Sequence, residues 1–89
     1  MPTLNVRVME KWSGRPVPNA KITLNGVQVM SYGDVPLISD NVGETSMELT
    51  TGSAKVCAVA RDYETACQTL NVVANTSINI IMTPIVRAL

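Results

Sequence analysis

The sequence contains no histidine and no phenylalanine, and its 89 residues include one tryptophan and two tyrosines. Without histidine, the Ser-His and Cys-His catalytic pairs and most zinc sites are excluded. Apolar residues still make up 46% of the chain, so the core is predicted to be aliphatic. We therefore expect a protein that is not an enzyme and that holds no cofactor.

Charged residues are also scarce, at 16% of the chain, and the seven basic residues balance the seven acidic ones. A balanced charge without a basic patch disfavours nucleic-acid binding. No apolar run approaches the ~20 residues that a membrane-spanning helix needs, so we expect no membrane insertion. Because little charge is left to keep copies apart, the expected partner is the protein itself or another structural protein.

Short alternating segments separated by turn residues run through the whole chain. Leu4, Val6 and Val8 share one face of the first predicted strand. Further strands are predicted over residues 20–24, 27–30, 45–50, 55–60, 65–73 and 77–82. Regular short strands with no sustained helical period favour a sandwich or barrel. The prediction is one all-β domain over residues 1–84, followed by an apolar tail over 85–89.

Four turn motifs occur at the spacing of a known domain family. They read Gly14/Pro16/Val17/Ala20, Ser39-Asp40-Asn41-Val42-Gly43, Gly52-Ser53-Ala54 and Asp62-Tyr63. On these motifs the chain resembles the carboxypeptidase regulatory-like domain, although that family usually has Tyr where this chain has Ala54 and Gly where it has Asp62. The resemblance implies an immunoglobulin-like or transthyretin-like β-sandwich of about seven strands. It also implies a non-enzymatic accessory role in secreted or surface proteins.

The two cysteines lie on either side of a predicted hairpin. If the turn is centred on Asp62, then Cys57 lies opposite Cys67, at a spacing that suits a disulfide. The alternative is a pair of reduced cysteines on the sheet. A disulfide requires an oxidising compartment, which favours a secreted segment or a virion component over a hyperthermophile protein. The expected location is therefore extracellular or on a virion surface.

Asp40, Asn41 and Glu44 lie in one predicted turn and carry the oxygen ligands that calcium prefers. Calcium needs about six oxygens or more, and no EF-hand spacing is present. The stronger interpretation is that Asp40 and Asn41 shape the turn, so we expect no metal.

Trp12 and Tyr32 lie in predicted loops, where binding residues concentrate. Exposed aromatic side chains in loops can stack on sugars or anchor a protein partner, so both are candidate ligand contacts. The alternative for Trp12 is that it covers one open end of the sandwich, held by Pro16 and Pro18.

Outward-facing apolar residues are predicted in three strands and in the C-terminal tail. They are Val59, Val73, Ile81, Ile85, Val86 and Leu89. A monomer rarely exposes this much apolar surface, which predicts an interface. The function expected from the sequence is a non-enzymatic structural or assembly module on a virion or cell surface, such as a decoration, fibre or filament component. The alternative is a carbohydrate- or peptide-binding accessory module of a larger secreted protein.

Overall fold

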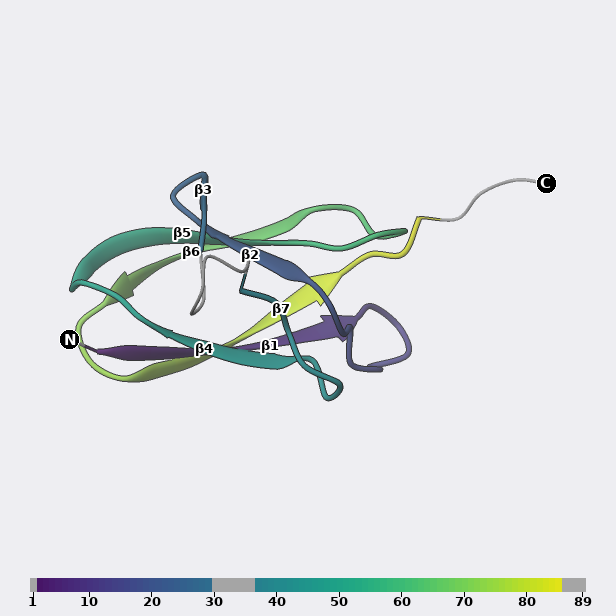
Figure 1. The fold of residues 1–89 in the computed structure, drawn as a ribbon, viewed down its shortest axis with the longest axis horizontal. Coiled ribbons are helices and arrows are strands. Elements are labelled where there is room, and N and C mark those ends of the chain that lie inside the picture. The colour runs from purple at the N-terminus through teal and green to yellow at the C-terminus, as the bar shows by residue number, and fades with distance from the viewer. Residues whose placement is uncertain (1, 30–36, 86–89) are drawn as a thin grey trace.

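The computed structural model describes residues 2–29 and 37–85, which form an all-β sandwich (Figure 1). The described part of the chain contains six strands of four or more residues and the two-residue β3. They are β1 (Thr3–Glu10), β2 (Lys21–Leu24), β3 (Val27–Gln28), β4 (Glu44–Glu48), β5 (Gly52–Val59), β6 (Ala66–Val72) and β7 (Thr76–Met82). This confirms the predicted fold class. Among the described residues no helix is long and apolar enough to cross a membrane.

The strands form two sheets that lie one above the other (Figure 1). One sheet has the order β4-β1-β7, and the other has the order β3-β2-β5-β6. The pair β1–β7 is parallel, with a register that runs from Leu4 opposite Thr76 to Glu10 opposite Met82. Every other pair is antiparallel.

The core between the two sheets is built from inward-facing side chains. These alternate with outward-facing ones along each strand. Leu4, Val6 and Val8 of β1 are almost fully buried. Their neighbours in β7, Ile78 and Ile80, are also buried. The core of described residues contains no aromatic side chain that is fully buried, so the predicted aliphatic core is confirmed.

The turn before β4 contains Gly43 in the left-handed backbone conformation, which glycine adopts at little cost. Gly43 has φ = +78°, and a Cβ at this position would lie 2.5 Å from the carbonyl oxygen of Val8. It would also crowd Pro16 and Val17, at 3.1 and 3.2 Å. The close approach exists because the amide of Val8 donates to the carbonyl of Gly43, while the amide of Val17 donates to the carbonyl of Val8.

Ser39 is the only buried polar residue in the described part of the chain. Its hydroxyl donates to the carbonyl of Val17 at 2.7 Å and accepts from the amide of Ala20 at 2.9 Å. Its own amide donates to the carbonyl of Ala20, and its carbonyl accepts from Asn19. One hydroxyl therefore fixes the segment before β2 against the segment before β4.

A disulfide joins Cys57 of β5 to Cys67 of β6, as the hairpin register predicted. The two residues lie directly opposite each other, with their Cα atoms 4.0 Å apart. The turn between the two strands includes Asp62 at φ = +67°. Asp62 thus adopts the left-handed conformation at the position where the carboxypeptidase regulatory-like pattern has glycine.

Candidate functional site: the outer face and edges of the sandwich

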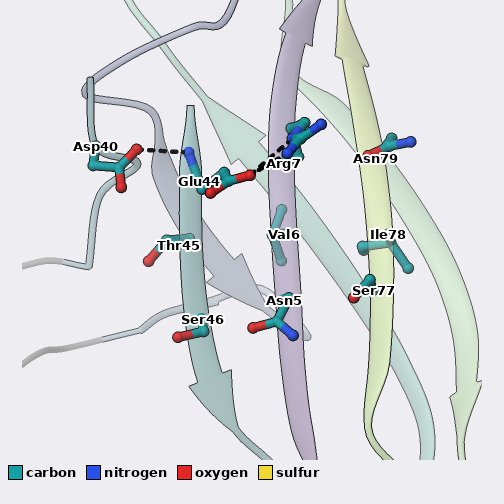
Figure 2. Close-up of a pocket in the computed structure, with 10 residues that line it drawn as sticks. All are labelled: Asn5, Val6, Arg7, Asp40, Glu44, Thr45, Ser46, Ser77, Ile78 and Asn79. Carbon is teal, nitrogen blue, oxygen red and sulfur yellow. Dashed lines mark hydrogen bonds and ion pairs between the residues drawn. The ribbon is translucent and has the colours of Figure 1, made fainter. Parts of the chain in front are cut away.

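The outer face of the β4-β1-β7 sheet carries rows of short polar side chains (Figure 2). In one row Asn5 lies between Ser46 and Ser77, and in the next Arg7 lies between Glu44 and Asn79. Successive side chains of a strand point to opposite faces of the sheet, so every second residue contributes to these rows. The residues between them point inward to the core. A shallow groove of about 570 Å³ follows this face. It is lined by Asn5, Val6, Arg7, Asp40, Glu44, Thr45, Ser46, Ser77, Ile78 and Asn79.

The charged groups of this groove are bonded to one another or to the backbone. Arg7 forms an ion pair with Glu44 and donates from Nε to Oε1 at 3.0 Å. The Asp40 carboxylate accepts from the amides of Val42 and Glu44, at 3.0 and 2.9 Å, and so shapes the turn before β4. Among the described residues no cluster of three or more metal-ligating side chains occurs. The remaining amide and hydroxyl groups suit hydrogen bonding to an uncharged polar ligand.

At the end of β1, the Glu10 carboxylate accepts hydrogen bonds from two hydroxyl groups. One comes from Tyr63 and the other from Ser13, at 2.7 Å. The Tyr63 hydrogen bond, with a smaller contribution from Ser13, lowers the pKa of Glu10 below its usual range. The same bond to Glu10 raises the pKa of Tyr63. This contact ties the end of β1 to the turn before β6.

Trp12 does not cover the end of the sandwich. Its side chain is 76% exposed, and its backbone has φ = +72°. The Lys11 ammonium lies 5.1 Å from the centre of the indole ring. The covering role is therefore wrong, because the loop after β1 turns the side chain outward. Trp12 remains a candidate ligand contact, whereas Tyr32 lies outside the described residues.

The apolar residues predicted to face outward are exposed wherever the structure describes them. Val73 is 75% exposed, and Val59, Ile81 and Ile85 are each at least 40% exposed. They do not form one patch. Val73 follows Val72, which pairs with Gly52 at the start of β5, whereas Val59 is at the opposite end of β5. The amide of Ile85 donates to the carbonyl of Asp62, so contact with the domain continues to that residue. Val86 and Leu89 lie outside the described residues.

The two lateral sides of the sandwich differ in charge. We call the side bounded by β6 and β7 the open side, and the side bounded by β3 and β4 the closed side. No charged residue occurs between Glu64 and Arg87, so β6 and β7 are both uncharged and free of proline. Within the described ranges, no strand pairs with the outer edge of either. The longest uncharged stretch of the sequence, residues 65–86, contains both strands. The predicted outward-facing apolar residues mark this side only at Val73 and Ile81.

Solved structures resemble this fold at low sequence identity. No protein-family model and no curated protein matches the sequence. A DUF3823 family protein from Bacteroides ovatus matches with a TM-score of 0.67 and 21% identity, over 94% of this chain and 44% of its own. The 5-hydroxyisourate hydrolase of Klebsiella pneumoniae matches with a TM-score of 0.66 and 14% identity, over 94% of this chain and 91% of its own.

A pilus adhesin from Streptococcus pneumoniae also has a similar fold, with a TM-score of 0.64 and 11% identity. It covers 99% of this chain and 16% of the adhesin. This chain therefore spans less than half the length of the DUF3823 protein and a small part of the adhesin. At these identities the likeness concerns the fold, which is a transthyretin-like or immunoglobulin-like β-sandwich.

Proposed function

We propose that this chain is a non-enzymatic structural module that assembles with further copies of itself on a cell or virion surface. The observation that carries the proposal is the open side, where two uncharged seven-residue strands present their edges. Such edges are templates for pairing with another strand. Monomeric proteins usually protect them with charges, prolines or short strands.

The closed side has these protective features. Glu44 and Glu48 place charges on β4, and the edge of β2 is covered by short pieces rather than by one long strand. The amide of Val29 donates to Ile22, whose own amide donates to Leu37.

Among the described residues, the open side is closed only at one end, where Tyr63 bridges Pro84 and the amide of Glu64 donates to the carbonyl of Thr83. This unequal protection of the two sides favours a specific contact surface over a general tendency to aggregate.

Two further features support the assembly role. Ile81 of β7 lies on the outer face, and Val73 follows β6, so both add exposed apolar surface at the open side. The Cys57–Cys67 disulfide suits an oxidising location such as a cell or virion surface. We further propose that the chain belongs to the carboxypeptidase regulatory-like family. The left-handed Gly43 and Asp62 support this assignment, since both occupy motif turns.

The test is solution mass by light scattering over a series of protein concentrations. Ile81→Lys places a charge on the open side, and Ser46→Lys places the same charge on the exposed face of β4. We expect the mass of the wild type and of Ser46→Lys to rise with concentration, while Ile81→Lys stays monomeric. At a concentration low enough for the wild type to be monomeric, both variants should unfold at the wild-type temperature, because both positions are exposed. A wild type that stays monomeric at every concentration, or equal dissociation of the two variants, would contradict the proposal.

The polar groove and Trp12 favour a second candidate, a carbohydrate-binding accessory module. The groove offers uncharged amide and hydroxyl groups, and Trp12 offers an exposed ring near the end of β1. Because Trp12 is the single tryptophan, its fluorescence reports directly on that loop. Titration with a defined oligosaccharide such as cellohexaose should shift this fluorescence if the candidate is right. An unchanged spectrum for a panel of such oligosaccharides would remove it.

A further inference from the structure

The first and last strands of this domain are neighbours in the same sheet and run in the same direction. Their register covers seven residue pairs, from Leu4 opposite Thr76 to Glu10 opposite Met82. The chain therefore enters β1 at one end of the sandwich and leaves β7 at the other (Figure 1). Thr3 and Asn75 mark the entry end, where the Thr3 amide donates to the Asn75 side chain at 2.9 Å.

We infer that the β1–β7 pair makes this domain a force-bearing link, able to carry tension along its own chain. A pull on the two chain ends draws β1 towards the entry end and β7 towards the exit end. The two strands are then loaded in shear, so the ladder between them resists as a whole. This role goes beyond the proposed function, because a domain can carry tension whether or not its edges bind another copy.

The direction of the pull matters because the hydrogen bonds between β1 and β7 break differently under shear and under separation from one end. In shear, the force lies along the strands and is shared by the whole ladder, which must give way together. When the strands are pulled apart from one end, each hydrogen bond bears the force in turn. Forced unfolding is governed by the rate of barrier crossing, so the load per bond decides the rupture force.

The β1 strand is held firmly enough for the β1–β7 ladder to be the point of failure. Five residue pairs join it to β4 on its other edge. Beyond these pairs, the amide of Val8 donates to Gly43, the amide of Glu10 donates to Arg15, and the amide of Leu49 donates to Pro2. Leu4, Val6 and Val8 are also buried, so sliding β1 would drag the core with it. Tension therefore reaches the β1–β7 ladder before β1 can leave the sheet.

The Cys57–Cys67 disulfide lies outside this ladder. It joins β5 to β6 in the other sheet and closes a loop with a sequence separation of 10. The disulfide should therefore shorten the extended length of the unfolded chain without setting the force at which the fold yields.

Single-molecule force spectroscopy tests the inference with two attachment geometries on the oxidised full chain. In the first, handles are fused to the two chain ends. In the second, one handle stays at the N-terminal end and the other is coupled through an azide-bearing side chain at Ala74, an exposed residue just before β7. The second geometry pulls the same two strands apart from their shared end.

We expect the end-to-end rupture force to be several-fold higher than the force in the Ala74 geometry. Equal forces, or a lower end-to-end force, would overturn the inference. Reduction of the disulfide should leave the end-to-end force unchanged and lengthen the released chain by roughly 30 Å, at ~3.5 Å per freed residue. A reduced protein whose end-to-end force falls to that of the Ala74 geometry would place the resistance in the β5–β6 hairpin and would also overturn it.

Discussion

The closed and open sides of this sandwich are built from different kinds of contact. On the closed side, the edge of β1 is shared among β4, Gly43 and residues 15–17, which fit against one another through specific turns. On the open side, β6 and β7 are unbroken strands whose one covalent reinforcement is the Cys57–Cys67 disulfide. One small core therefore supports two different sides. Turns of the same chain cover the closed side, whereas no described strand pairs with the outer edges of β6 and β7 on the open side.

The largest expected effect is on the closed side, at Gly43. Gly43→Val should lower the free energy of unfolding by about 2–6 kcal/mol, because left-handed strain and steric overlap add. The overlap arises because a Cβ would lie 2.5 Å from the Val8 carbonyl oxygen. Urea denaturation measures the loss.

Gly14→Val is the matched control for Gly43→Val. Gly14 also has a left-handed backbone, at φ = +71°, but no atom lies within 4 Å of a Cβ built there. Gly14→Val should therefore show backbone strain alone, about 1–3 kcal/mol. Equal losses at the two glycines would mean that the closed side does not fit as tightly as its geometry indicates.

The stability of the domain should depend on the disulfide that joins β6, on the open side, to β5. The double variant Cys57→Ala/Cys67→Ala should lose about 2.5–3 kcal/mol, the loop entropy expected for a closure of this length. The fold should persist, because the β5–β6 register is also fixed by seven residue pairs. Denaturation of the oxidised wild type and of the double variant gives the difference. A loss below about 0.5 kcal/mol would show that the hairpin needs no covalent support.

Ser39 offers a smaller test of the closed side. Ser39→Ala should lower the free energy of unfolding by about 1–3 kcal/mol, because a buried amide and a buried carbonyl lose their partner. These groups belong to Ala20 and Val17. Ser53→Ala, at an exposed position of β5, serves as the control and should be nearly neutral. Equal stability of Ser39→Ala and the wild type would mean that the buried hydroxyl does not hold these segments together.

The smallest effect is expected at the contact between Glu10 and Tyr63, which links the end of β1 to the turn before β6. Tyr63→Phe should raise the pKa of Glu10 towards its usual range, because the main cause of its lowering is removed. Ser13→Ala should raise it less, since Ser13 is the second cause. Carbon-detected NMR titration of the Glu10 carboxyl measures both shifts. An unchanged pKa in Tyr63→Phe would contradict the assigned hydrogen bond.

The same contact predicts how its stabilising effect depends on pH. Because the pKa of folded Glu10 is lowered, its contribution is present above the unfolded pKa and is lost as the pH falls through the folded pKa. Because the pKa of folded Tyr63 is raised, the contribution of its neutral phenol is present below the unfolded pKa and is lost as the pH rises through the folded pKa.

Local alternation and turn residues made much of the fold predictable from the sequence. The pairing of Cys57 with Cys67 followed from a short hairpin, in which one turn position sets the register of both strands. The outward position of Ile81 followed from the alternation of β7. Both inferences need only neighbouring residues.

Features that depend on distant segments could not be predicted in this way. The crowding at Gly43 involves Val8 and Pro16, which other parts of the chain bring to it. The parallel pairing of β1 with β7 joins the two ends of the domain, and neither strand carries a local signal for its partner. The exposure of Trp12 depends on a left-handed backbone at a residue that rarely adopts one.

The central claim, that the open side is the contact surface, is tested most directly by amide hydrogen exchange at low and high protein concentration. We predict that exchange slows with concentration at the amides of β6 and β7, while the amides of β4 exchange at the same rate throughout. Slowing confined to β4, or no dependence on concentration in any strand, would contradict the account.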